Sequence, residues 1–268
     1  MRNRAFRREH PGLAIPPARL LYRTTASVDL RVHFESGASS AAFIAGLIAR
    51  HLGDRSGLRV LEWGCGSGRC IRHLPGRLPG ARLTGADVDA RAIGWCRSAL
   101  PSIAFVENGP FPPLPFPAGV FDAVYAISVF THLSELAGIA WMAELGRVLA
   151  PGGIVIFTTR GDTFTGFLSD AERAAYQAYG FAVTTDDDRE GHKHHLAHHA
   201  EAYVRGRLAS GLEVIELEPA EPGSGLQDVW VLRKPEVGGL PSAGSQAARG
   251  APSAEHARLI PDRSEDAR

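Results

Sequence analysis

The stretch Val60-Leu61-Glu62-Trp63-Gly64-Cys65-Gly66-Ser67-Gly68 decides the fold, because an apolar run passes there directly into a glycine-rich loop. It predicts a β-strand over residues 59–63, followed by a tight turn and residues of helical character. The glycines let the backbone turn sharply and approach a ligand closely. Glycines alone are weak evidence, because nicotinamide and flavin proteins use a similar loop and some βα turns need glycine without any ligand.

The chain beyond this loop alternates between short strands and helices. Further strands are expected at residues 82–87, 103–106, 121–126 and 153–158, and helices at 90–100 and 134–149. Such alternation is typical of a parallel sheet that helices cover on both faces. A hairpin-like pair of strands, at 212–217 and 228–232, is predicted at the end. The fold class is therefore α/β, with a mostly parallel seven-stranded sheet and a terminal antiparallel strand.

The remaining segments complete a three-part division of the chain. Residues 1–37 mix arginine, proline and short apolar stretches and are predicted to be an N-terminal arm or lid, before a helix at 38–51. The domain proper is expected over residues 38–235, with more helices at 171–179 and 201–209. Residues 236–268 lack large apolar side chains, cannot offset their ordering entropy, and are predicted to be a disordered tail.

Composition narrows the partners and the compartment. The 268 residues are 44% hydrophobic, enough for a core, and 29 Lys plus Arg balance 29 Asp plus Glu. This balance gives no reason to expect nucleic acid or membrane as a partner, and no apolar run approaches the ~20 residues of a membrane span. Cys65, Cys70 and Cys96 form no CxxC pair, which favours a reducing cytoplasm. Arginine in place of lysine, with abundant alanine and glycine, indicates a bacterial source.

Four motifs together resemble the class I S-adenosylmethionine-dependent methyltransferases. The first is Glu62-x-Gly64-x-Gly66-x-Gly68; a dinucleotide loop would place its third glycine one position later. The others are Thr84-Gly85-Ala86-Asp87-Val88-Asp89, Ser128-Val129-Phe130-Thr131-His132-Leu133 and Arg147-Val148-Leu149-Ala150-Pro151-Gly152-Gly153. The resemblance covers residues 59–159 and implies a Rossmann-like, doubly wound sheet that binds S-adenosylmethionine.

The resemblance also assigns the cofactor-binding residues. The loop would wrap the amino-acid end of S-adenosylmethionine through Glu62, Gly64, Cys65, Gly66 and Gly68. Asp87 lies about twenty residues after the loop, where a carboxylate can reach ribose hydroxyls, and Val88 follows it. Asn108 stands where the family usually has an acidic residue beside adenine, and it can still accept from the adenine amino group. Ser128 would pack along the cofactor, whereas Asp89 is expected to cap a helix.

Three histidines are the candidate catalytic residues: His132, His195 and His199. By resemblance His132 faces the methyl group, where an oxygen acceptor benefits from a general base. The other two belong to a histidine-rich run at 192–199 with three open interpretations: a solvated loop, a segment of the acceptor pocket, or, if helical, metal ligands at i,i+4 spacing. The solvated loop is favoured, and no metal is expected because no matching carboxylate motif accompanies the run.

The predicted function is methyl transfer to an oxygen of a small-molecule or glycan acceptor. Residues 15–23 and 34–37 are similar to the lead-in of bacterial methyltransferases associated with glycan and secondary-metabolite tailoring. That similarity would make Tyr22 and Arg23 part of a lid; alternatively they only anchor the arm. Two other functions remain open, a non-catalytic S-adenosylmethionine-binding scaffold and a nicotinamide-dependent oxidoreductase. The sequence indicates no oligomeric state.

Overall fold

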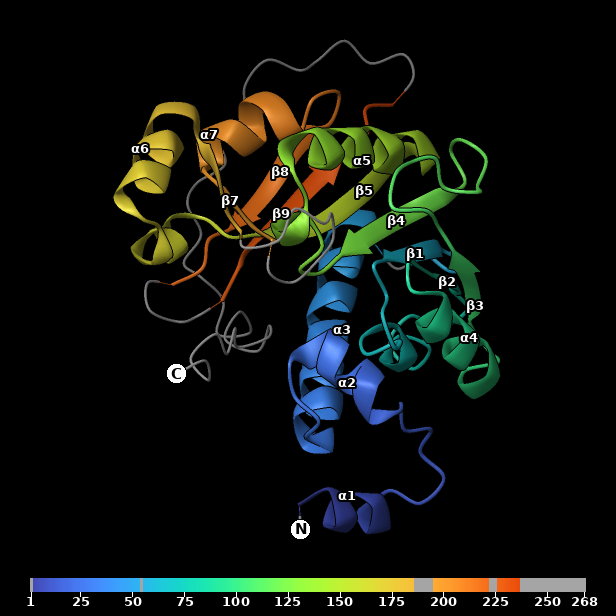
Figure 1. Ribbon diagram of the computed structural model, residues 1–268. Coiled ribbons are helices and arrows are strands. Elements are labelled where there is room, and N and C mark those ends of the chain that lie inside the picture. The colour runs from blue at the N-terminus through green and yellow to red at the C-terminus, as the bar shows by residue number, and fades with distance from the viewer. Residues whose placement is uncertain (1, 54, 186–194, 222–225, 237–268) are drawn as a thin grey trace. The chain divides into compact units, whose positions relative to one another are not determined.

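The computed structural model describes residues 2–53, 55–185, 195–221 and 226–236, which fall into two compact units. Unit 1 extends to Leu114 and unit 2 begins at Pro115. Figure 1 shows both units and labels most of their helices and strands. Each unit is described by itself below.

Unit 1 is built on three parallel strands. Its elements in chain order are α1 (Arg2–Glu9), α2 (Ala18–Thr25), α3 (Leu30–Leu52), β1 (Arg59–Trp63), η1 (Ile71–His73), β2 (Arg82–Asp87), α4 (Ala90–Ala99) and β3 (Ala104–Glu107). β1 pairs with β2, and β2 pairs with β3, up to the register Trp63↔Ala86 and Asp87↔Glu107. The three strands therefore end at one edge, where ligands bind in sheets of this kind.

The N-terminal segment of unit 1 is more helical than the sequence predicted. α3 starts at Leu30 rather than at residue 38, because Asp29 caps it by accepting the Arg31 N–H at 2.9 Å. Gly37, which was expected to precede the helix, lies inside it. A Cβ at Gly37 would collide with the carbonyl oxygen of Arg69, so close packing explains this glycine.

By length and composition α3 is also able to cross a membrane, contrary to the expectation that no apolar run is long enough. More than half of its most apolar window, 56%, is buried inside the structure. The buried side chains include His33, Ile44 and Leu47. A core helix of a folded domain passes the same test of length and composition.

Unit 2 contains the remaining strands and the aromatic core. Its elements are β4 (Phe121–Ala126), η2 (Phe130–His132), α5 (Glu135–Val148), β5 (Leu149–Thr159), η3 (Asp162–Phe167), α6 (Asp170–Tyr179), β6 (Phe181–Thr185), β7 (His195–His199), α7 (Glu201–Tyr203), η4 (Val204–Leu208), β8 (Glu213–Glu218) and β9 (Asp228–Arg233). β4 and β5 are parallel, whereas β9 runs antiparallel to both β5 and β8. Phe157 packs between Phe130 and Trp230, with ring centroids 5.0 and 6.3 Å away.

The seven main strands form one sheet in the order β3-β2-β1-β4-β5-β9-β8. Three of the expected strands have the predicted bounds, and the expected pair at the end is the antiparallel pair β8–β9. The α/β, Rossmann-like prediction with a terminal antiparallel strand is therefore confirmed. The expected helix at 201–209 is α7 continued by one π-helical turn, η4.

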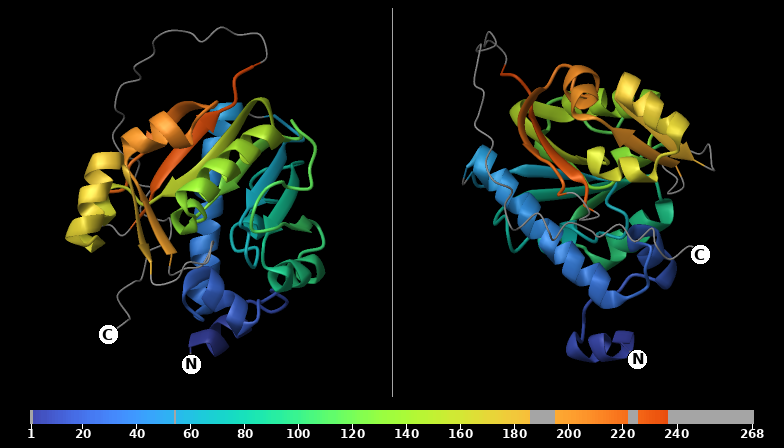
Figure 2. Two further views of the ribbon diagram at one scale, coloured as in Figure 1. Left: turned by 45° about the horizontal axis from the view of Figure 1, so that its top comes forward. Right: turned by 90° about the vertical axis from the view of Figure 1, so that its left-hand side faces the viewer.

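The histidine-rich run contradicts the favoured prediction of a solvated loop. Residues 195–199 form strand β7, which pairs antiparallel with β6 in a separate two-stranded sheet. α6 lies beside this hairpin (Figure 2) and packs on β6. The histidines of β7 are buried, with exposed fractions of 7% for His195, 1% for His198 and 2% for His199. Residues 192–194 of the run lie outside the described residues.

Candidate functional site

The glycine loop after β1 has the geometry that the sequence predicted. Gly64, Gly66 and Gly68 all have positive φ, at 78°, 51° and 68°. The N–H groups of Gly64 and Cys65 both donate to the Ala86 carbonyl, at 2.8 and 3.0 Å, which ties the loop to β2. At Gly68 an added Cβ would also come within 2.8 Å of Leu100 Cδ1. Both backbone conformation and close approach therefore require glycine here.

Glu62 and Cys65 are packed inside unit 1 rather than exposed. The Glu62 side chain is 5% exposed, and its Oε2 accepts the Ile71 N–H at 3.0 Å. It therefore holds the start of η1, where a helix end leaves N–H groups to be satisfied. Burial raises the pKa of the Cys65 thiol, which stays protonated. The predicted contacts of Glu62 and Cys65 with the cofactor remain predictions.

Asp87 joins the end of β2 to the glycine loop. Its Oδ2 accepts the Gly66 N–H at 2.7 Å, and its Oδ1 accepts the Asp89 N–H at 2.8 Å. Burial raises the pKa of the Asp87 carboxyl, while these two N–H donors act in the opposite direction. Asp89 caps α4, as predicted, by accepting from the N–H groups of Arg91 and Ala92.

Val88 and Asn108 follow β2 and β3 next to each other, because Asp87 pairs with Glu107 and the Asn108 N–H donates to the Asp87 carbonyl at 3.1 Å. The Val88 side chain is 51% exposed, whereas Asn108 is 8% exposed. The Asn108 amide donates to the Gly109 carbonyl at 2.7 Å. Its buried Oδ1 has no hydrogen-bond partner in the described part of the chain. Such an oxygen is costly unless a ligand or water donates to it.

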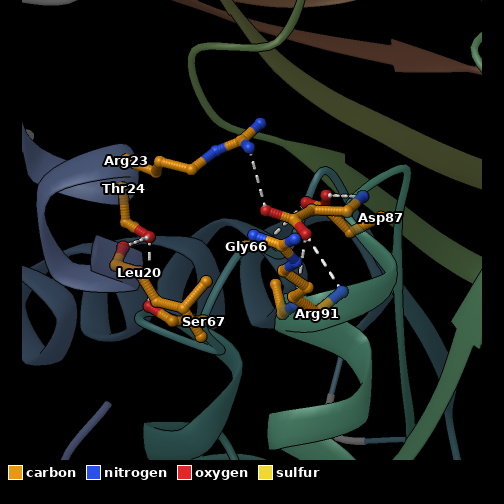
Figure 3. A network of polar contacts seen from close by, with 9 residues as sticks. Leu20, Arg23, Thr24, Gly66, Ser67, Asp87 and Arg91 are labelled. Carbon is orange, nitrogen blue, oxygen red and sulfur yellow. Dashed lines mark hydrogen bonds and ion pairs between the residues drawn. The ribbon is translucent and has the colours of Figure 1, made fainter. Parts of the chain in front are cut away.

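Helix α2 contacts the glycine loop and the end of β2 (Figure 3). The hydroxyls of Thr24 and Ser67 lie 3.0 Å apart, and Thr24 Oγ1 also donates to the Leu20 carbonyl. Arg23 forms an ion pair with Asp89 at 3.2 Å. These contacts attach the helix to the loop, whereas Tyr22 is half exposed. The lid role of Tyr22 and Arg23 remains a prediction.

Ser128 follows β4 in unit 2 with a φ of 56°, a conformation that is uncommon for a residue with a side chain. Its N–H donates to Thr158 Oγ1 at 2.8 Å, and its hydroxyl donates to Gln227 Oε1 at 3.0 Å. Thr158 Oγ1 in turn donates to the same Gln227 oxygen at 2.6 Å. Ser128, Thr158 and Gln227 therefore form a closed hydrogen-bond network. The cofactor contact of Ser128 remains a prediction.

His132 has an orientation suited to a base. Its Nδ1 lies 3.0 Å from the His195 carbonyl oxygen. A carbonyl only accepts, so Nδ1 must carry the proton, and in the neutral ring Nε2 carries the lone pair. The structure thus brings two of the three predicted histidines together, but through the backbone of His195 rather than through its ring.

The other histidine rings are buried in unit 2. Neither ring nitrogen of His195 has a hydrogen-bond partner among the described residues. His199 lies against Phe181 and Tyr203, with ring centroids 5.1 and 5.9 Å away. Burial, with a contribution from His198, lowers the pKa of His199 to about 3. Its ring is therefore neutral and a weak base, so the geometry gives His199 less support than His132.

The metal interpretation of the histidine run required a helix, and residues 195–199 are a strand. In a strand His195 and His199 share one face and His198 points to the other. No group of three or more His, Cys, Asp or Glu within the described ranges could hold a metal ion.

The sequence did not identify Gln227, Thr158 or Thr24. Gln227 lies directly before β9 and belongs to no motif, and Thr158 is one of two threonines that end β5. Gly85 is a fourth such residue: a Cβ there would lie 2.9 Å from Cys65 Sγ and 2.7 Å from the Phe105 ring. A glycine inside a predicted strand is a signal for close packing, and could have been used.

Comparison with known proteins agrees with this geometry. Residues 60–153 match a family model described as a methyltransferase domain. A sterol 24-C-methyltransferase of Gibberella zeae is 35% identical over 113 residues, which are 40% of this chain and 29% of the relative. A fatty-acid O-methyltransferase of Mycolicibacterium smegmatis is 36% identical over 107 residues, or 39% of this chain and 38% of the relative. The chain thus spans about a third of the length of these curated relatives.

A solved structure shares the fold. It is the 1,6-didemethyltoxoflavin-N1-methyltransferase of Burkholderia thailandensis with bound 1,6-didemethyltoxoflavin and S-adenosylhomocysteine. The TM-score is 0.53 at 17% identity, covering 75% of this chain and 80% of that chain. The domain match and this fold support S-adenosylmethionine as the cofactor. Residues 60–153 are therefore similar to the methyltransferase-domain family, and the chain shares the fold of this solved methyltransferase.

Proposed function

We propose that this chain binds S-adenosylmethionine and transfers its methyl group to a small-molecule acceptor. One observation carries the proposal: Asp87, Val88 and Asn108 adjoin one another at the ends of β2 and β3. They offer a carboxylate, an exposed apolar side chain and a buried amide oxygen without a partner. An adenosine needs these same three features, for its ribose hydroxyls, its base and its amino group.

The glycine loop supports the same orientation. The Gly66 N–H is held by Asp87, so a ligand that hydrogen bonds to Asp87 is also placed beside the loop. When bound, S-adenosylmethionine supplies an electrophilic methyl group on a sulfonium. The protein then has to align the acceptor lone pair and exclude water.

For the acceptor, we propose an oxygen nucleophile with His132 as the general base. The hydrogen bond from Nδ1 to the His195 carbonyl supports this role, because it fixes the ring and puts the basic lone pair on Nε2. The relatives named above act, by their names, on a carbon, an oxygen and a nitrogen. The proposal therefore includes a small lipid, a sterol and a glycan as acceptors.

A cytoplasmic location is part of the proposal. The three cysteines Cys65, Cys70 and Cys96 are buried and free of disulfides, which supports a reducing compartment.

Calorimetry with matched ligands tests the cofactor proposal. S-adenosylhomocysteine should bind in the micromolar range and raise the melting temperature. S-inosylhomocysteine, which replaces the amino group with an oxygen, should bind more weakly to the wild type. Asn108→Ala should remove that discrimination, because the accepting oxygen is gone. Tighter binding of NAD than of S-adenosylhomocysteine would sink the proposal and favour an oxidoreductase. Cofactor binding without methyl transfer to any acceptor would favour a scaffold.

A further inference from the structure

Gln227 lies where the carboxyl end of β5 meets the start of β9. β9 pairs antiparallel with β5 through Thr159↔Asp228 and Thr158↔Val229, so the residue before Asp228 is next to the end of β5. Ser128 follows β4, which is the parallel neighbour of β5. This edge of a parallel sheet is where ligands bind in α/β proteins.

The network around Gln227 fixes the orientation of its amide. Oε1 accepts from two hydroxyls, that of Ser128 at 3.0 Å and that of Thr158 at 2.6 Å. The Thr158 hydroxyl itself accepts the Ser128 N–H. With the oxygen held on this side, the two N–H groups of Nε2 must point the other way. The side-chain hydrogen bonds that Gln227 makes with the described residues all end on Oε1.

The network also maintains an unfavourable backbone conformation. Ser128 has a φ of 56°, a conformation that is unfavourable for a residue with a Cβ. The hydrogen bonds from its N–H and hydroxyl offset that cost. Strain of this kind is commonly maintained where a side chain has to be held in place for a ligand. A chain of hydrogen bonds further polarises the amide and strengthens its donors.

We propose that Gln227 is a specificity-determining residue whose side-chain amide donates to a carbonyl or carboxylate oxygen of the methyl acceptor. The inference rests on the proposed function and adds a chemical class to its acceptor. A rigid N–H donor favours a molecule with an oxygen that can accept, and disfavours an analogue without one, because the donor is then left unsatisfied. Ser128 and Thr158 are the positioning residues.

Two variants separate the donor from the network. Gln227→Glu keeps an oxygen for the hydroxyls of Ser128 and Thr158 but replaces the donors with a negative oxygen. Gln227→Met removes both the amide oxygen and the N–H donors and keeps a side chain of similar length. Gln177→Glu, at an exposed glutamine on α6, is the matched control for the added charge. Melting temperature and S-adenosylhomocysteine affinity report whether each variant keeps its fold and its cofactor site.

The probes are dodecanoate and benzoate, each compared with the alcohol of the same skeleton. Calorimetry in the presence and absence of S-adenosylhomocysteine measures their affinities. We expect the wild type to bind at least one carboxylate more tightly than the corresponding alcohol. Gln227→Glu should bind that carboxylate at least tenfold more weakly, and Gln227→Met should bind the carboxylate and the alcohol equally. Gln177→Glu should match the wild type.

Three outcomes overturn the inference: a wild type without preference for either carboxylate, a wild type that binds neither, or unchanged carboxylate affinity in both Gln227 variants. Loss of S-adenosylhomocysteine binding by the wild type is a different result. It overturns the proposed function. The carboxylate affinities measured in the absence of S-adenosylhomocysteine then still test the role of Gln227.

Discussion

The carboxylate of Asp87 accepts the backbone N–H of Gly66 at 2.7 Å, across 21 residues of sequence. This hydrogen bond joins the end of β2 to the glycine loop. A ligand that bound Asp87 would therefore lie beside the loop.

Asp87→Asn should weaken S-adenosylhomocysteine binding by about 1–3 kcal/mol, because an amide cannot accept from the two N–H groups and also serve both ribose hydroxyls. Asp170→Asn, at an exposed residue in the first turn of α6, is the control. Calorimetry gives the affinities and thermal unfolding gives the stability. Equal affinities in Asp87→Asn and the wild type would show that the ribose lies elsewhere.

Gly68→Ala should destabilise unit 1 for two separate reasons. The residue has a φ of 68°, and the new Cβ would lie 2.8 Å from Leu100 Cδ1. Backbone strain costs about 1–2 kcal/mol and overpacking about 1–3 kcal/mol more. Gly12→Ala pays only the first cost, since nothing lies within 4 Å of its Cβ position at a φ of 83°.

Adding Leu100→Ala separates the two costs. The double variant Gly68→Ala with Leu100→Ala should lose less stability than the two single variants predict together, because the smaller side chain removes the collision. Urea unfolding of the four proteins measures the coupling. Strict additivity would contradict the close approach at Gly68.

How far the sequence predicts this structure can be seen at Asp89 and Gly37. Asp89 was expected to cap a helix, and it does so because capping depends only on residues two and three places along the chain. The sequence predicts Gly37 just before a helix, but Gly37 lies inside α3 and packs against Arg69, which is distant in sequence. A contact between near neighbours in the sequence can be predicted from the sequence. The need for a glycine beside a backbone atom that is distant in the sequence cannot.

The same distinction holds in the candidate site. The glycine loop and Asp87 each follow directly from one strand, so the sequence predicts their positions; their contacts with a cofactor remain predictions. The polar histidines at 195–199 favoured the wrong prediction of a solvated loop, because their burial depends on the pairing with β6 and on packing against Phe181 and Tyr203. Gln227 gains its orientation from Ser128, which is 99 residues away.

Stability should fall as the pH drops below about 6.5. Burial, with the charges of Arg69 and Arg72, lowers the pKa of His33 to about 3 from 6.5, and burial lowers that of His199 to about 3. Between these values the unfolded chain binds more protons than the folded one, so the free energy of unfolding decreases with falling pH and levels off near pH 3. The shift of each of these two pKa values, from 6.5 to about 3, corresponds to a loss of about 5 kcal/mol when the pH falls through that whole range.

Replacing the buried histidines tests this dependence. His33→Leu and His199→Leu, singly and together, should reduce the slope of the free energy of unfolding against pH between pH 4 and 6.5. Above pH 7 the free energy of unfolding should stay independent of the pH in these variants, as in the wild type. Thermal or urea unfolding across that range measures the slope. An unchanged slope in the double variant would show that these rings are protonated in the folded chain.

His132→Asn tests the proposed base with little change in geometry. The asparagine amide can still donate to the His195 carbonyl, which now accepts from His132 Nδ1 at 3.0 Å. It has no basic nitrogen, so the rate of methyl transfer to a hydroxyl or carboxylate acceptor should fall by roughly 10²–10⁴-fold. S-adenosylhomocysteine affinity should stay the same, because a base acts on the transition state. Tritiated S-adenosylmethionine measures the rate. Equal rates in His132→Asn and the wild type would leave alignment of the acceptor, rather than proton removal, as the source of catalysis.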